Sequence, residues 1–417
     1  MRILRRAAAM AALLMGAVGI QVIQGGAVQA ALPTAAVALG DSFVSGEGAG
    51  DYQPVVDISG TAQAFPGWSA ANGNAYFCHR SANASLFKAS FPGIQDRFNL
   101  ACSGGQPADI ANPSGARAKG RAVASQLDQL RAVAQTHDID VVLVGLGSNN
   151  SQFTFGDVAT VCANRFIADA WTGWWEFWAY LGGDVPQEPC TVSDLASDAE
   201  VAAATTETTA ALRQILDTLA QIDADGVHRV VLQTYTNPLP LDVAPQYRDE
   251  DNRTDTRDKF RALGAERYAA GCPIHRASLA PGHVFSQNLG SLVKNAYATL
   301  AAERPAADLR VLDVQKAFDG ARLCENPGSP TGALATPVRV QDGPTGTYVT
   351  SLSGWDKIGV QRVANTCVTY FQTCQEAWHP NAAGHTVLGQ CLTGALIATP
   401  RTIVTCARNA NGTLTVS

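Results

Sequence analysis

Short apolar runs that end in turn residues alternate with stretches of helical periodicity along most of this chain. The apolar runs cover residues 35–39, 98–102, 140–146, 229–235 and 309–314. The helical stretches cover residues 122–135, 199–222, 256–270, 287–303 and 382–397. Strands that alternate with helices favour a parallel sheet covered by helices on both faces. The pattern therefore predicts a three-layer α/β/α fold with a central parallel sheet of about five strands.

Residues 1–30 have the features of a signal peptide. Arg2, Arg5 and Arg6 precede an apolar run, and a small-residue cleavage site ends at Ala30. A membrane anchor is the alternative, but the run is rich in alanine and glycine and short for a bilayer span. We expect a secreted, extracellular protein that is cleaved near Ala30. The adjacent arginines leave the export route open.

The composition is that of a globular protein with a large core. Hydrophobic residues make up 46% of the chain and charged residues 16%, with a formal net charge of −6 at pH 7. No lysine or arginine cluster stands out, so no nucleic-acid or anionic-lipid footprint is visible. We interpret residues 31–417 as one domain with insertions near residues 165–190 and 328–374, and expect a monomer without stable membrane insertion.

Ten cysteines follow the signal-peptide segment, and their number predicts disulfides in an exported chain. They are Cys78, Cys102, Cys162, Cys190, Cys272, Cys324, Cys367, Cys374, Cys391 and Cys406. The metal alternative is weaker, because no Cys-x-x-Cys or His-x-x-x-His pair occurs and the seven histidines are scattered. We therefore expect no metal site.

A candidate nucleophile, Ser42, follows the first apolar run of the exported chain, in the Gly-Asp-Ser-Phe sequence of residues 40–43. Ligands bind beyond the carboxyl ends of parallel strands, where Ser42, Gly104 and Asn149 would all emerge. A serine at a strand-to-helix turn can direct its hydroxyl into that crevice. Glycine, aspartate and serine are also ordinary turn residues, so this sequence alone does not distinguish a nucleophile from a simple turn.

A serine hydroxyl needs a base within hydrogen-bond reach, and His379 is the best candidate. It precedes Pro380 and a predicted helix, so its loop should be rigid. The other histidines considered are His79, His283 and His385. Glu376, three residues before the base, could orient the imidazole and stabilise its charged form. A main-chain carbonyl near Ala377 could orient the ring instead, and both alternatives stay open.

The oxyanion of a tetrahedral intermediate needs hydrogen-bond donors aimed at it. Three candidates are the backbone N–H of Ser42, the backbone N–H of Gly104 and the side-chain amide of Asn149. Glycine permits unusual dihedral angles, and a neutral amide donates without competing for the proton.

Four segments, which contain Ser42, Gly104, Asn149 and His379 in this order, together resemble the GDSL/SGNH hydrolase family, which is named for its Ser, Gly, Asn and His. The resemblance implies a flavodoxin-like hydrolase fold and a carboxylic ester hydrolase without a cofactor. Residue by residue, it implies Ser42 as nucleophile, His379 as base, and Gly104 and Asn149 in the oxyanion hole. The substrate it implies is a small-molecule ester, a lipid ester or an acylated glycan.

The segments Cys-His-Arg-Ser at residues 78–81 and Ala-Cys-Ser-Gly at residues 101–104 further resemble the secreted actinobacterial esterases and lipases of this family. That similarity implies the pairs Cys78–Cys102, Cys162–Cys190 and Cys272–Cys324. Proximity alone suggests Cys367–Cys374 and Cys391–Cys406.

The chain departs from the family pattern in two blocks and in its insertions. Residues 147–150 read Gly-Ser-Asn-Asn where the family has Gly-Gly-Asn-Asp, and Glu376 replaces an aspartate. The tryptophans of one insertion, Trp171, Trp174, Trp175 and Trp178, could pack the insertion on the core or contact sugar or lipid. The alternative function is accordingly a non-catalytic secreted module that binds carbohydrate or lipid.

Overall fold

The computed structural model describes residues 31–53, 78–113, 123–155, 158, 162, 189–191, 194–222, 226, 228–241, 275–322, 341–342, 347–348 and 379–417. The chain divides into one unit over Met1–Leu32 and another over Pro33–Ser417. Every element below belongs to the second unit. The predicted signal peptide, the predicted helix over residues 256–270 and the four tryptophans lie outside the described residues.

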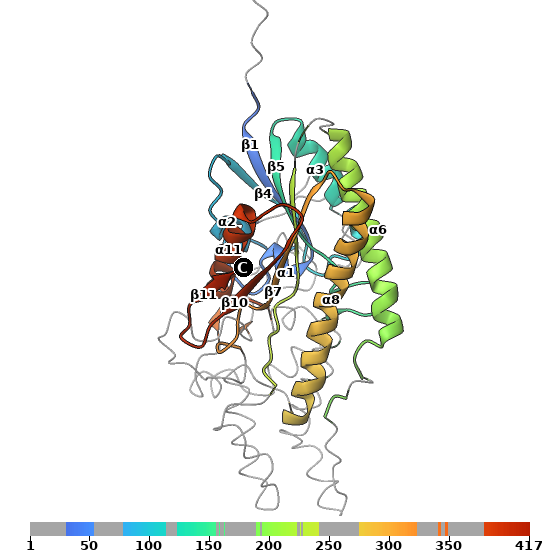
Figure 1. Ribbon diagram of the computed structural model, residues 1–417, viewed down its shortest axis with the longest axis vertical. Coiled ribbons are helices and arrows are strands. Elements are labelled where there is room, and N and C mark those ends of the chain that lie inside the picture. Colours follow the sequence, from blue (N-terminus) through green and yellow to red (C-terminus); the bar gives the residue numbers. More distant parts are fainter. Residues whose placement is uncertain are drawn as a thin grey trace, which may run out of the picture. The chain divides into compact units, whose positions relative to one another are not determined.

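A seven-stranded sheet forms the centre of the second unit (Figure 1). Its strands, in spatial order, are β11 (Leu414–Val416), β10 (Ile403–Arg408), β7 (Asp308–Lys316), β6 (Arg229–Gln233), β5 (Asp138–Gly145), β1 (Thr34–Gly40) and β4 (Asp96–Asn99). Neighbouring strands run parallel except β10 and β11, which are antiparallel. The predicted parallel sheet is confirmed, and the predicted number of strands is too low.

The two strands absent from the prediction, β10 and β11, form one edge of the sheet. Nearly every residue of the central strands β1 and β5 is buried, because parallel strands are covered on both faces. Along β10, buried Val404 and Cys406 alternate with partly exposed residues. This segment therefore lacks the continuous apolar run by which the other strands were predicted.

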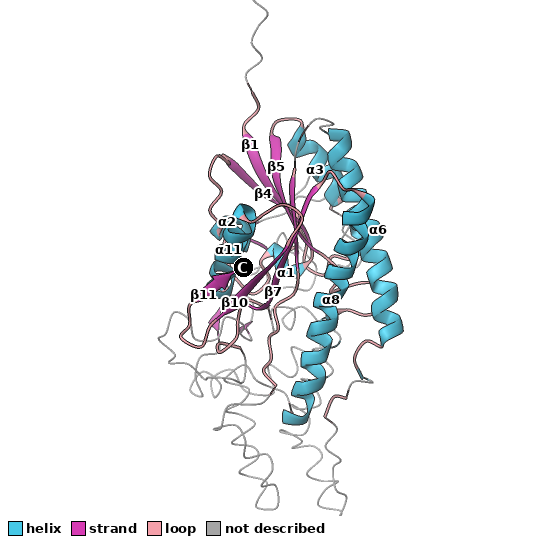
Figure 2. Cartoon of the chain, in the orientation of Figure 1, coloured by secondary structure: helices cyan, strands magenta, loops and turns pink. Residues whose placement is uncertain are grey.

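Helices cover both faces of the sheet (Figure 2). The helices α3 (Gln126–Ala134), α6 (Asp198–Ile222) and α8 (Leu279–Glu303) pack on one face, and α2 (Ser85–Lys88) and α11 (Ala382–Ile397) on the other. The predicted three-layer α/β/α arrangement is thus confirmed. Within the part of the chain that the structure describes, no helix combines the length and apolarity needed to cross a membrane.

The helix boundaries agree with the predicted periodicity to different degrees. Helix α11 has the predicted bounds, whereas α3 begins at Gln126 because the Ser125 hydroxyl accepts a hydrogen bond from Asp128 N–H at 3.0 Å. Helix α8 begins at Leu279, well before the predicted residue 287.

Several short elements complete the described fold. They are the helix α1 (Ser42–Ser45), the antiparallel strands β2 (Tyr52–Gln53) and β3 (Arg80–Ser81), the antiparallel strands β8 (Gln341–Asp342) and β9 (Thr347–Tyr348), and the 3₁₀ helices η2 (Pro107–Ile110) and η6 (Arg276–Ser278). Strands β8 and β9 belong to the predicted insertion over residues 328–374, most of which lies outside the described residues.

Three disulfides join described cysteines: Cys78–Cys102, Cys162–Cys190 and Cys391–Cys406. The first two pairs were implied by the family resemblance and the third by proximity, and all three are confirmed. The predicted pairs Cys272–Cys324 and Cys367–Cys374 lie outside the described residues.

Candidate active site

The nucleophile candidate Ser42 is the first residue of α1, directly after β1. Its predecessor Asp41 caps this helix, because the Asp41 carboxylate accepts a hydrogen bond from Phe43 N–H at 3.1 Å. Gly40 has a φ of 129°, and a Cβ there would stand 1.8 Å from the carbonyl oxygen of Gly145. Only glycine therefore lets β1 turn this tightly beside β5.

Two neighbouring elements fix the position of this turn. The Asp41 N–H donates to the carbonyl oxygen of Gly145 at 2.8 Å, which ties the turn to the end of β5. The Gln126 side chain of α3 accepts from Gly40 N–H at 2.7 Å and donates to the Gly40 carbonyl oxygen at 2.8 Å. The backbone that precedes Ser42 is therefore held from two sides before any substrate arrives.

The predicted base lies beside the predicted nucleophile. His379 Nε2 is 2.8 Å from Ser42 Oγ, although 337 positions separate them in the sequence. Both side chains are buried, and the Phe43 and Phe155 rings pack against the imidazole. At this distance the hydroxyl can donate to the imidazole, which is the geometry that general-base activation of a serine requires.

The residues after His379 connect it closely to α11. Asn381 caps α11, since its side-chain oxygen accepts a hydrogen bond from Gly384 N–H at 2.9 Å. Pro380 stands between the base and this cap, so the imidazole is attached directly to the start of a long buried helix.

The other histidines considered from the sequence have different surroundings. His79 Nδ1 lies 2.7 Å from both carboxylate oxygens of Glu47. His385 accepts a hydrogen bond from Ser85 N–H at 3.2 Å, and burial lowers the pKa of its imidazole to about 3. His283 contacts Asn237. Of these histidines, His379 is the one that meets Ser42.

Gly104 lies in a turn that packs directly against the start of the nucleophile segment. The Cys102 N–H donates to the carbonyl oxygen of Gly40 at 3.1 Å, and a Cβ on Gly105 would stand 2.9 Å from that same oxygen. Gly104 itself has a φ of 72° and is exposed. The left-handed conformation and the close approach of Gly105 explain two adjacent glycines at this point.

Asn149 and Asn150, the adjacent amides after β5, have contrasting environments. The Asn150 side chain donates to the Gly147 carbonyl oxygen at 3.1 Å and accepts from the N–H groups of Gln152 and Phe153 at 2.8 and 3.0 Å. The Asn149 side-chain amide makes no hydrogen bond to any described residue. Asn150 thus holds the turn, while the Asn149 amide is available as a donor.

The third member of the predicted catalytic set, Glu376, lies outside the described residues, as does Ala377. Whether a carboxylate or a main-chain carbonyl orients His379 therefore stays a prediction. Among the described residues, no three histidine, cysteine, aspartate or glutamate side chains converge as metal ligands.

A hydrogen-bonded cluster below Ser42 was not predicted from the sequence. The Asp41 carboxylate accepts from the Ser148 hydroxyl at 2.7 Å and from the Tyr235 hydroxyl at 2.5 Å, and Tyr235 in turn accepts from Ser148 N–H at 2.8 Å. All three side chains are buried. Burial raises the pKa of Asp41 to about 6, although these hydrogen bonds act in the opposite direction.

A second unpredicted cluster surrounds Glu47, just after α1. The Glu47 carboxylate accepts from His79 and from the Ser103 hydroxyl, and the Tyr52 ring stacks on the imidazole of His79 at 4.4 Å. Burial alone would raise the pKa of Glu47, but the adjacent His79 holds it below its ordinary value. The family resemblance rests in part on the segments that contain His79 and Ser103. It does not indicate that both side chains contact the Glu47 carboxylate.

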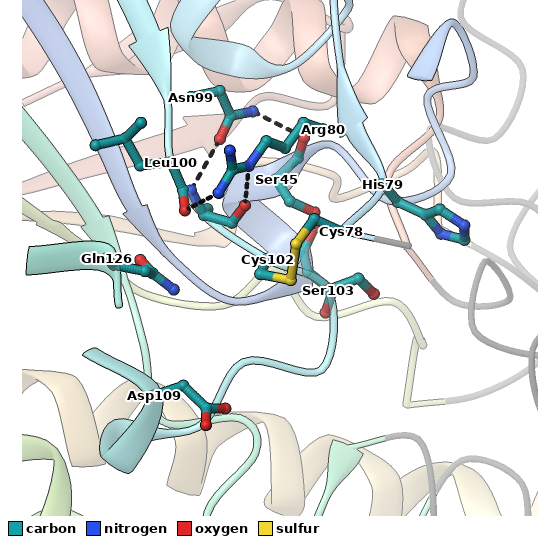
Figure 3. The surroundings of a disulfide bond; sticks show 12 residues. Ser45, Cys78, His79, Arg80, Asn99, Leu100, Cys102, Ser103, Asp109 and Gln126 are labelled. Atoms are coloured by element: carbon teal, nitrogen blue, oxygen red, sulfur yellow. Dashed lines mark hydrogen bonds between the residues drawn. A yellow bond between two sulfur atoms is a disulfide. The ribbon is translucent and has the colours of Figure 1, made fainter. Parts of the chain in front are cut away.

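Figure 3 shows how the disulfide organises this side of the site. The Cys78–Cys102 bond joins the segment that carries His79 to the segment that carries Ser103. Arg80 reinforces the junction, since its guanidinium donates to the carbonyl oxygens of Leu100 and Ala101 at 2.7 and 2.8 Å. The turn that contains Gly104 begins at Ser103, and the disulfide anchors the chain at Cys102, directly before it.

Comparison with solved structures gives matches of low identity. The extracellular lipase from Streptomyces rimosus is 18% identical, with a TM-score of 0.42 over 87% of this chain and 99% of the lipase. Phospholipase A1 from Streptomyces albidoflavus is 17% identical, with a TM-score of 0.39 over 88% of this chain and 98% of that enzyme. A family two carbohydrate esterase from Clostridium thermocellum is 10% identical, with a TM-score of 0.32 over 87% of this chain and 63% of the esterase.

No protein-family model matches the chain. No curated protein matches it either.

Proposed function

We propose that this protein is a secreted serine ester hydrolase in which Ser42 is the nucleophile and His379 the general base. The observation that carries the proposal is the buried contact of 2.8 Å between Ser42 Oγ and His379 Nε2. A serine at the end of a central strand and a histidine before α11 have no structural reason to meet there. As a reacting pair they form the simplest device for activating a hydroxyl.

The proposed reaction proceeds through an acyl-enzyme. His379 Nε2 takes the proton of Ser42 Oγ as the oxygen attacks the ester carbonyl carbon. The protonated imidazole then gives this proton to the leaving alkoxide, and the acyl group stays on Ser42. A water molecule, activated in the same way by His379, attacks the acyl carbon and releases the carboxylic acid.

The negative oxygen of each tetrahedral intermediate would be stabilised by the N–H groups of Ser42 and Gly104 and by the side-chain amide of Asn149. Support comes from the turn that carries Gly104, which packs on Gly40, and from the uncommitted amide of Asn149. Donors fixed in place before the reaction cost no reorganisation when the charge develops.

Substitution of the nucleophile tests this assignment. We expect Ser42→Ala to lower kcat for a p-nitrophenyl ester by about 10³-fold or more, with an unchanged melting temperature. An organophosphonate should add one covalent group to the wild-type protein, which mass spectrometry of peptides would locate on Ser42. Near-native kcat in the variant would refute the assignment. A panel of acetyl to palmitoyl esters, with an acetylated glycan and a phospholipid, would define the substrate class.

We also propose Glu376 as the carboxylate that orients His379, with a main-chain carbonyl as the alternative. If Glu376 has this role, Glu376→Gln should lower kcat by orders of magnitude, whereas orientation by a carbonyl predicts a loss of about tenfold or less. The measurement is kcat against pH for both proteins, and an unchanged profile would remove Glu376 from the mechanism.

Export is proposed on two grounds. Residues 1–30 have a signal-peptide pattern, and disulfides such as the three among the described residues persist in oxidising compartments. The mature protein would then be a single hydrolase domain over residues 31–417. N-terminal sequencing of protein from the culture medium should give a start directly after Ala30.

A further inference from the structure

Both residues proposed as oxyanion donors outside the nucleophile segment follow a serine directly. Ser103 precedes Gly104, and Ser148 precedes Asn149. Each serine hydroxyl donates to a fully buried carboxylate, and the two carboxylates, Asp41 and Glu47, both belong to the segment that carries Ser42. The two turns come from different strands, so this repetition is not a consequence of one local motif.

Two hydrogen-bonded paths connect Ser148, the residue before Asn149, to Asp41. Ser148 Oγ donates to Asp41 Oδ2 at 2.7 Å. The Ser148 N–H donates to the Tyr235 hydroxyl at 2.8 Å, and that hydroxyl donates to the same Asp41 oxygen at 2.5 Å. The other carboxylate oxygen accepts from Phe43 N–H at 3.1 Å. One carboxylate thus fixes the start of α1 and the residue that precedes Asn149.

On the side of Gly104, the Ser103 hydroxyl donates to Glu47 Oε2, and Ser103 N–H donates to the carbonyl oxygen of Cys78 at 3.0 Å. Glycine has no side chain that could pack and hold its N–H in a particular direction. The orientation of Gly104 must therefore come from its neighbours, of which Ser103 is the one whose side chain is bonded to the nucleophile segment.

We infer that Ser148 and Ser103 are positioning residues that, through Asp41 and Glu47, hold the Asn149 and Gly104 donors in register with Ser42. The inference rests on the proposed function, because register matters only if an oxyanion forms at Ser42. A displacement of about 1 Å in a reacting group can cost roughly 100-fold in rate, so a hydrogen bond that fixes a donor contributes to kcat. Ser148 stands where the family pattern usually has glycine, which has no hydroxyl to donate.

The test is a set of single substitutions measured with a p-nitrophenyl ester. We expect Ser148→Ala and Ser103→Ala each to lower kcat by roughly 10- to 100-fold with KM changed by less than about twofold, because the oxyanion exists only after attack. Ser103→Thr keeps the hydroxyl and should retain most of the activity. Tyr235→Phe, which removes the second path and keeps the ring, should lower kcat in the same direction even if Ser148→Ala folds poorly.

The matched control is Ser197→Ala. Ser197 Oγ also donates to a carboxylate, that of Glu200 at 2.8 Å, but at the start of α6 and without a bond to the nucleophile segment. This variant also loses a serine–carboxylate hydrogen bond, in this case an exposed one, and should keep wild-type kcat. If Ser148→Ala and Ser103→Ala lowered only the melting temperature and left kcat like that of the control, the inference would be overturned.

A double-mutant cycle separates positioning from general destabilisation. If Ser148 acts through Asn149, then adding Ser148→Ala to Asn149→Ala should lower kcat by less than about threefold. Ser103→Ala should still lower kcat in the Asn149→Ala background, because it acts on another donor. Full additivity of Ser148→Ala would contradict the inference. Retained activity in Ser42→Ala, by contrast, would refute the proposed function itself.

Discussion

Asp41 and Glu47 are both fully buried carboxylates in the segment around Ser42, and their partners differ in charge. Asp41 receives hydrogen bonds from neutral groups, namely the hydroxyls of Ser148 and Tyr235 and one backbone N–H. Glu47 receives one hydroxyl and also faces an imidazole, that of His79. Burial accordingly raises the pKa of Asp41 to about 6, while the pKa of Glu47 lies below its ordinary value.

This difference shows two ways to keep a carboxylate next to a nucleophile. Among the described residues the Asp41 carboxylate has no cationic partner, so its charge depends on a complete set of neutral donors. On the Glu47 side an ion pair holds the charge, and the Cys78–Cys102 disulfide joins the segments that carry His79 and Ser103. The structure around Asp41 should therefore be most sensitive to loss of a hydrogen-bond donor or to a change of pH. The structure around Glu47 should be most sensitive to loss of the Cys78–Cys102 disulfide.

The largest expected effect concerns the donor on the Asp41 side. Asn149→Ala should lower kcat by about 10²–10³-fold, equivalent to roughly 2.7–4 kcal/mol, with little change in KM, because its amide acts chiefly in the transition state. Asn150→Ala should act on stability instead, since its side chain makes three hydrogen bonds within the turn. Steady-state kinetics and thermal melts of both variants check this. A larger loss of kcat in Asn150→Ala would place the oxyanion hole around Asn150.

Asn149, Asn150 and the Ser42–His379 pair show how much of the candidate site could be predicted from the sequence. Ser42 and His379 were identified because each stands beside a recognisable strand or helix end, and the structure brings them together across 337 positions. The order of the blocks predicted which strands carry the site. The assignment of the donor to Asn149 followed from the pattern of the third block and agrees with its uncommitted amide.

The carboxylate clusters could not be predicted in the same way. Tyr235 lies 194 positions from Asp41, and nothing in its local sequence indicates a buried partner. His79 stands in a quoted motif, at residues 78–81, but a motif does not state that its imidazole meets the Glu47 carboxylate. These two side chains lie 32 positions apart in the sequence and meet only in the tertiary structure. The strands β10 and β11 were missed because their apolar residues are few or alternate.

A smaller effect is expected from the disulfide on the Glu47 side. Removing Cys78–Cys102 with a double alanine substitution should lower the free energy of unfolding by about 2–4 kcal/mol. It should also lower kcat, because only hydrogen bonds would then hold the segments of His79 and Ser103 together. The matched control is the double alanine variant of Cys391 and Cys406, a pair that joins α11 to β10. This control should lose comparable stability and keep kcat. Equal kcat losses in both variants would contradict a specific role for the first disulfide.

The smallest expected effect is the response of stability to pH, which should have opposite signs for the two carboxylates. Because the pKa of Asp41 is raised from 3.8 to about 6, the folded protein binds a proton here that the unfolded chain has released. The contribution of Asp41 to stability therefore increases as the pH falls from 7 through 6, and the ionised form is the costly one above that value. Tyr235 does not compete for this proton, since burial and the nearby Asp41 charge raise its pKa well above 10.

The measurement is the melting temperature of the wild type minus that of Asp41→Asn, taken from pH 7 to pH 5. This difference should grow by a few degrees towards pH 5, because only the wild type gains a proton at this position. The wild type minus Glu47→Gln should stay nearly constant over this range and shrink once the pH is taken below 4.5. The lowered pKa of Glu47 contributes stability above its ordinary value of 4.5, and this contribution is lost as the pH falls below it. If the Asp41 difference stayed constant or shrank towards pH 5, then a cation outside the described residues would have to compensate Asp41, and the two sides of Ser42 would be electrostatically alike.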